Sequence, residues 1–250
     1  MKKKKKVLLI VLSVFPGIPV LIALIFIVLI AFKNEDAKFV TANFIDLEQI
    51  EGITKFRSCY GHNAGRIINN DEPASSLKNY VNAKSKQALG EGVRINIYAP
   101  FDGFIFGGYS NEGSVHDRHI FLAPNFSGWA MAYDHIDPLP KVKFGHRFSA
   151  GDLLGYGKLN PDHPEDAGSF DVEMGFVPQI DIGVDSVFNH MTDGVLKEFA
   201  DYGITPENII VSREEREANP CECHEDGGSD CRFYPEHTYP DQAIRAEVIE

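Results

Sequence analysis

The chain has 250 residues, enough for one large domain or two small ones with a hydrophobic core. Six of its 24 basic residues and none of its 36 acidic residues lie in residues 1–33, which leaves residues 34–250 with a formal charge of −18. This excess of carboxylates argues against nucleic acid as a partner, because phosphates need clustered Lys and Arg side chains.

The N-terminus predicts a membrane anchor. Residues 1–6 are a basic tail with five lysines, and residues 7–32 form a run of 26 residues without a charge. About 20 apolar residues cross a hydrocarbon core, and flanking lysines favour the cytoplasmic side. A cleaved signal peptide is the alternative, but its apolar run is about 7–15 residues long. We expect a single-pass membrane protein with a cytoplasmic N-terminus and an extracytoplasmic main domain.

Residues 33–55 are polar and weakly patterned, and they predict a stalk. Residues 56–180 predict a mainly β domain, because short runs of β-forming residues alternate with turns rich in Gly and Pro. Such spacing is typical of a β-sandwich or half-barrel. The expected strands cover residues 95–98, 104–106, 119–122, 129–133, 142–144, 153–154 and 170–177.

Residues 181–250 predict a short helical, cysteine-bearing extension. Apolar residues recur at helical spacing from Val187 to Phe199. Thr205 and Pro206 are typical of a helix start, and a polar helix is expected from Ser212 to Ala218.

The four cysteines are expected to form disulfides, since an extracytoplasmic compartment is oxidising. They are Cys59, Cys221, Cys223 and Cys231, and the sequence leaves all three pairings open. The alternative is a zinc cluster in which the last three cysteines act with nearby histidines. Its C-x-C start differs from the C-x-x-C of common zinc modules, so we favour disulfides.

Three motifs occur in order: YAPFDGFI at residues 98–105, AYDHI at 132–136 and FGHRFSAGDLLG at 144–155. In order and spacing they resemble the motifs of the lysostaphin/LytM-type zinc metallopeptidases, which have the duplicated hybrid motif fold. The resemblance covers about residues 56–178. It implies a lysostaphin-like β domain, and for an active member a zinc-dependent hydrolase of cell-wall peptides.

The resemblance also implies a metal site, and the chain departs from it. His62 falls at the first metal-binding histidine, but Arg66 stands where the family has an aspartate ligand. Asp171 and Glu173 stand at the catalytic and metal-binding histidines of a His-x-His motif, and His135 matches a further catalytic histidine. The other histidines, His116, His119, His146 and His163, have no useful spacing and are expected at the surface.

Two interpretations follow. In a rebuilt site, His62 and Glu173 would bind a divalent cation such as zinc, and His135 or Asp171 would assist proton transfer. In a degenerate site, Arg66 would pair with a carboxylate and replace the metal. We favour weak or absent zinc, and hence a module that binds a cell-wall peptide or a protein partner. The alternative is an active metallopeptidase that hydrolyses cell-wall cross-links.

Overall fold

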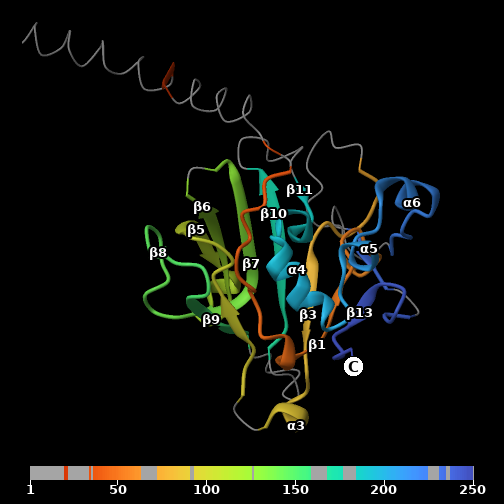
Figure 1. Ribbon diagram of the computed structural model, residues 1–250, viewed down its shortest axis with the longest axis horizontal. Helices are drawn as coiled ribbons and strands as arrows, with labels where there is room; N and C mark the ends of the chain where they lie inside the picture. Colours follow the sequence, from red (N-terminus) through yellow and green to blue (C-terminus); the bar gives the residue numbers. More distant parts are fainter. Residues whose placement is uncertain are drawn as a thin grey trace, which may run out of the picture. The chain divides into compact units, whose positions relative to one another are not determined.

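Figure 1 shows the computed structural model, in which the chain forms two units, Met1–Glu35 and Asp36–Glu250. The structure describes residues 20–21, 34, 36–62, 72–90, 93–125, 127–158, 168–176, 184–224, 231–234 and 237–249. Of the predicted span at residues 7–32 it describes only Val20 and Leu21. No described helix has both the length and the apolar character to cross a membrane.

The second unit is mainly β, as the sequence predicts. Its strands are β1 (Ile50–Thr54), β2 (Gly61–His62), β3 (Asn79–Ala83), β4 (Asn96–Tyr98), β5 (Gly103–Ser110), β6 (Arg118–Pro124), β7 (Trp129–Pro138), β8 (Arg147–Phe148), β9 (Leu153–Gly157), β10 (Phe170–Phe176), β11 (Val184–Asp185), β12 (Arg232–Phe233) and β13 (Ala243–Arg245). The helices are α3 (Lys86–Leu89), α4 (Asp193–Ala200), α5 (Pro206–Ile209) and α6 (Arg213–Ala218), with 3-10 turns η1 (Leu47–Gln49), η2 (Asn111–Gly113) and η4 (Val187–His190).

Eleven of the described strands form one sheet with the order β13-β1-β3-β10-β7-β6-β5-β8. Strand β11 also pairs with β10, and β9 pairs with both β4 and the end of β7. Figure 1 shows β7 and β10 side by side in the middle of this sheet. All of their neighbours pair with them antiparallel.

The two faces of β7 and β10 differ because side chains of a strand alternate. One face is apolar and fully buried, and it forms the core. The opposite face carries small and acidic residues instead. The core face holds Trp129, Met131, Tyr133, Phe170, Val172 and Met174, and the opposite face holds Ala130, Ala132, Asp134, Asp171 and Glu173.

The segment predicted as a stalk is part of the core from residue 36 onward, so the stalk is wrong for that part. Val40, Phe44 and Ile53 are each fully buried, and β1 pairs with β3 and β13. Phe44 packs against Tyr133 of β7 and Phe199 of α4. The segment has no clear period because most of it is irregular chain that packs only at single residues.

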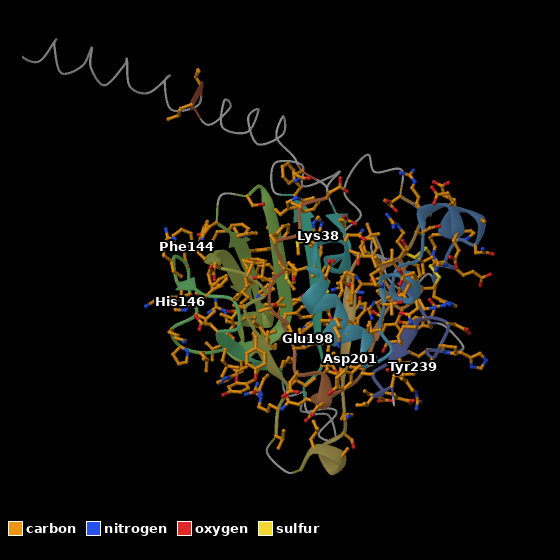
Figure 2. All side chains as sticks on the ribbon, viewed as in Figure 1. Lys38, Phe144, His146, Glu198, Asp201 and Tyr239 are labelled. Atoms are coloured by element: carbon orange, nitrogen blue, oxygen red, sulfur yellow. A yellow bond between two sulfur atoms is a disulfide. The ribbon has the colours of Figure 1, made fainter. Side chains whose placement is uncertain are left out.

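The helix expected from Val187 to Phe199 is broken in two. Met191 forms a parallel bridge with Val40, which keeps the chain extended between η4 and α4. The strand expected at residues 142–144 is also wrong. Val142 is buried in a turn, whereas Phe144 is 80% exposed (Figure 2), and the pairing strand is β8.

Two disulfides fasten the C-terminal extension, which confirms the expected oxidation and excludes the zinc cluster. Cys59 is bonded to Cys221 and Cys223 to Cys231, so all four cysteines are used. The extension also adds β13 to the edge of the large sheet and pairs β12 with β2. Residues 184–249 are therefore built into the domain wherever the structure describes them.

Replacing Cys59 and Cys221 by Ala should lower the free energy of unfolding more than replacing Cys223 and Cys231. The first bond closes a sequence separation of 162 residues and the second one of 8. Loop-closure entropy then predicts losses of about 5 and about 2.5 kcal/mol. Urea unfolding of the full chain in detergent can be followed by the fluorescence of Trp129, the single tryptophan. Equal losses would contradict the entropic origin of the difference.

Candidate functional site

A β-bulge positions His135. Between β6 and β7 the register passes from Arg118 opposite Ile136 to Ile120 opposite Tyr133, so β7 has one extra residue there. His135 takes up the irregularity with a left-handed backbone, φ 59°. Such a conformation costs a non-glycine residue about 1–2 kcal/mol, and bulges often re-aim a side chain. Here the bulge turns His135 to the same side as the preceding Asp134, and both approach Asp117.

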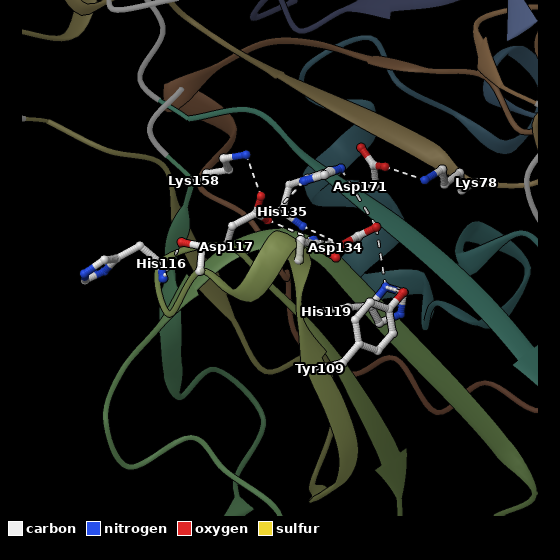
Figure 3. A network of polar contacts seen from close by, with 11 residues as sticks. Lys78, Tyr109, His116, Asp117, His119, Asp134, His135, Lys158 and Asp171 are labelled. Atoms are coloured by element: carbon white, nitrogen blue, oxygen red, sulfur yellow. Dashed lines mark hydrogen bonds and ion pairs between the residues drawn. The ribbon is translucent and has the colours of Figure 1, made fainter. Parts of the chain in front are cut away.

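A buried ion pair joins β10 to the residue before β3. Asp171 lies opposite Asp134 of β7 on one side and Tyr80 of β3 on the other. The Lys78 ammonium donates to Asp171 Oδ2 at 2.5 Å, and both side chains are at most 7% exposed (Figure 3). Burial lowers the pKa of Lys78, but Asp171, Tyr80 and Asp134 together raise it overall. Burial likewise raises the pKa of Asp171, and Lys78 opposes that rise.

A second lysine–aspartate pair lies beside His135. The Lys158 ammonium donates to Asp117 Oδ2 at 2.5 Å, and His135 Nδ1 lies 3.1 Å from Asp117 Oδ1. The Asn111 amide also donates to Asp117. Burial raises the pKa of Asp117, but the bonds from Lys158 and Asn111 and the charge of His135 lower it overall. Asp117 is thus a saturated acceptor.

Asp134 extends the network from His135 to His119, as Figure 3 shows. It accepts from the Asn111 amide and from the backbone N–H of His135, and its Oδ2 lies 3.4 Å from Nδ1 of His119. Burial raises the pKa of Asp134, but these donors lower it well below its usual range. The His119 ring stacks on Tyr109, whose hydroxyl lies 3.0 Å from the same Nδ1. His119 is buried, so the expectation of a surface histidine is wrong.

Three of the predicted site residues share a cavity. His62, His135 and Asp171 line a space of about 380 Å³ together with Tyr60, Tyr80, Lys158 and Ser169. His62 lies on β2, whose partner β12 belongs to the C-terminal extension. A neighbouring space of about 650 Å³ also contains His62 and His135, and the extension contributes Arg232, Phe233, Tyr234 and Thr238 to its wall.

Glu173 lies elsewhere, although it is only two residues from Asp171 on the same face of β10. It lines an open groove of about 310 Å³ with His119 of β6. The remaining lining is apolar: Phe106, Phe121, Ala130, Met131, Ala132, Gly175, Phe176 and Val184. The predicted meeting of Asp171 and Glu173 in one metal pocket therefore does not occur. Arg66 lies outside the described residues.

The geometry does not fit a zinc ion held by the predicted ligands. Among the described residues, the one group of three side chains with ligand atoms within 4.8 Å of one another is Asp117, Asp134 and His135. It includes neither His62 nor Glu173. Lys158 already occupies Asp117 of this group, and an ammonium repels a divalent cation at such distances.

The sequence did not single out the two lysines, Asp117 or Asp134. The available signal was a charged side chain at the edge of an otherwise apolar strand, as for His119 beside Ile120, Phe121 and Leu122. Such a residue commonly faces solvent. Whether it faces solvent or is buried in a polar network depends on which strands lie beside it, and that order is not visible in the sequence.

No family model and no curated protein matches the sequence. Solved structures do resemble the fold. The catalytic domain of lysostaphin from Staphylococcus simulans shares 15% identity over 52% of this chain and 81% of its own, with a TM-score of 0.32. LytU shares 16% identity over 50% of this chain and 73% of its own, with a TM-score of 0.32. The SpoIIQ–SpoIIIAH pore-forming complex contains a chain that shares 14% identity over 62% of this chain and 91% of its own, with a TM-score of 0.40.

The chain is similar in fold to these solved structures, at identities of 14–16%.

Replacing Lys78 by Met should destabilise the domain by about 3–5 kcal/mol at pH 7, because Asp171 would remain buried without a counter-charge. The pKa of Asp171 would rise further without Lys78. As the pH falls from 7 toward about 4, the usual carboxyl pKa, Asp171 should become protonated in the folded variant. The free energies of unfolding of the variant and the unmodified chain should therefore become more similar. Urea unfolding at several pH values measures this.

Lys197→Met is the matched control. Lys197 pairs with Asp201 on the exposed side of α4, where its side chain is 75% exposed. Its loss should change stability by less than about 1 kcal/mol at any pH. A Lys78 variant that behaves like the control would contradict the buried ion pair.

Proposed function

We propose that residues 36–250 form a non-hydrolytic binding module, which the N-terminal span holds on the extracytoplasmic side of a membrane. The observation that carries this proposal is the Lys78–Asp171 pair. Asp171 stands where the family resemblance implies a catalytic histidine, and its carboxylate is already bound by a buried ammonium. A group held in this way is a poor proton carrier for hydrolysis, because either change of protonation would leave an unpaired buried charge.

We therefore keep the interpretation of a degenerate metal site, with lysine ammonium groups in the role that the sequence predicts for the Arg66 guanidinium. Arg66 was expected to replace the metal, whereas Lys78 supplies the contact with Asp171 and Lys158 supplies the contact with Asp117. Both ammonium groups occupy acceptors that a divalent ion would need. We therefore propose weak or absent zinc.

The open groove supports an extended peptide as the ligand, from the cell wall or from a partner protein. Its small residues, Ala130, Ala132 and Gly175, let a bound main chain come close to the sheet, while Phe106 and Phe121 provide apolar contact area. The active metallopeptidase remains the second candidate, because His62, His135 and Asp171 do line one cavity.

The purified full chain should contain well under one zinc per molecule and should not hydrolyse cross-linked wall peptides. Zinc content by atomic absorption and product release by mass spectrometry measure these two properties. One tightly bound zinc per chain would overturn the proposal. Hydrolysis that His62→Ala abolishes would establish the peptidase instead.

A designed site provides a positive control. Asp171→His adds a third imidazole to the cavity that His62 and His135 already line. We expect zinc binding to become at least about tenfold tighter when Lys78→Ala is added, because removing the ammonium removes its repulsion of the ion. Competition with a chromogenic chelator measures the affinity. Equal affinities with and without Lys78 would show that the lysine does not govern metal binding.

The membrane topology gives a separate prediction. Because residues 7–32 are uncharged and follow five lysines, protease added to intact spheroplasts should digest residues 36–250, and the chain should fractionate with membranes. An epitope tag at each end reports which side is cut. Protection of the domain, or its release without detergent, would contradict the anchor.

A further inference from the structure

The groove beside Glu173 has one charged group and an apolar wall. Glu173 comes from β10, the floor residues Ala130 and Ala132 come from β7, and Phe121 comes from β6. The rings of Phe106 and Phe121 pack with centroids 5.6 Å apart, which forms one side of the groove. A volume of about 310 Å³ lies at the lower end of ligand sites. It suits one long side chain rather than a large cofactor.

Among the residues that the structure describes, Glu173 has no counter-charge in direct contact. No hydrogen bond or ion pair joins its carboxylate to another described residue, unlike Asp171, Asp117 and Asp134. Burial raises the pKa of Glu173, and Lys78 and His119 oppose this from a distance. Lys78, which has the larger of these two effects, is itself bonded to Asp171. The Glu173 carboxylate can therefore accept hydrogen bonds from a ligand in the groove.

His119 supplies a second unsatisfied group at the same place. Its Nδ1 faces Tyr109 and Asp134, but Nε2 is buried and has no hydrogen-bond partner among the described residues. The ring itself lines the groove and is only 9% exposed. A buried polar atom without a partner is unfavourable by about 1–3 kcal/mol.

The chemistry of the lining selects the ligand. A carboxylate at one end of an apolar groove favours a cation on an apolar stem, and the aromatic wall adds cation–π attraction. An anion would meet Glu173 and the acidic domain, whose residues 34–250 carry −18. A metal ion would find one carboxylate and no third ligand among the described residues. An ammonium needs fewer acceptors than a guanidinium with five donors.

We propose that this groove binds a primary ammonium on an unbranched aliphatic stem, such as a lysine side chain of a bound peptide, with the ammonium at Glu173. This inference rests on the proposed function and names the ligand feature that the module recognises. The stem would lie over Ala130, Ala132 and Gly175, between Phe121 and Val184.

The test compares two capped peptides, acetyl-Ala-Ala-Lys-Ala-Ala-amide and its norleucine analogue, which has nearly the same stem without the charge. The full chain is reconstituted in nanodiscs of a zwitterionic lipid, and empty nanodiscs are the blank. We expect the lysine peptide to bind at least about tenfold more tightly, because a charge-assisted hydrogen bond adds to the burial of the stem. An arginine analogue should bind more weakly than lysine.

Glu173→Gln should reduce the affinity for the lysine peptide by at least about tenfold and leave that for the norleucine peptide unchanged. Glu198→Gln on α4 is the matched control, because Glu198 is exposed (Figure 2) and is not among the residues that line the groove. Ala132→Leu should weaken both peptides by filling the groove. Thermal unfolding verifies that each variant is folded.

Equal binding of the lysine and norleucine peptides would overturn the inference and leave a non-hydrolytic peptide-binding module intact. So would an unchanged lysine affinity in Glu173→Gln, or no binding of either peptide at millimolar concentration. Hydrolysis of a wall peptide or stoichiometric zinc would instead remove the proposed function. The two failures therefore give different results.

Discussion

The Lys78–Asp171 ion pair is the interaction on which the polar face of the sheet depends. It lies where β3, β10 and β7 meet, and two buried charges are stable there only together. Asp134 lies opposite Asp171 in the register, so without the ammonium two carboxylates would face each other inside the domain. Lys78 supplies the positive charge that balances Asp171 there.

The same principle recurs at the bulge in β7. His135 takes up an unfavourable backbone so that its ring can reach Asp117, and Lys158 neutralises that carboxylate. Two lysines and two histidines thus satisfy three aspartates (Figure 3). Glu173 is outside this network. The face is therefore divided into a saturated part, which stabilises the sheet, and one carboxylate that is open to a ligand.

The C-terminal extension determines the surroundings of His62. Strand β12 pairs with β2, and the Cys59–Cys221 bond joins the chain just before β2 to the extension. Tyr234 and Arg232 then line the space that also contains His62 and His135. The disulfides consequently do more than stabilise the domain, since they bring a second wall to the predicted site.

The sequence alone was sufficient for β4, β5, β6, β7, β9 and β10, because the alternation of β7 and β10 and the turn motifs are local properties. It predicted no strand at β1 or β3. It did predict oxidised cysteines. Of the five side chains expected in one site, His62, His135 and Asp171 line one cavity, whereas Glu173 lines a different groove and Arg66 lies outside the described residues. The sequence could not find Lys78, which is 93 positions from Asp171 and has no local pattern to mark it. Nor could it show that Asp171 and Glu173, on one strand face, serve different spaces, because neighbouring strands decide which acid meets a lysine. The sequence by itself determines the local periodicity of each strand. The partner of a buried charge is determined only when strands that are distant in the sequence pair with each other.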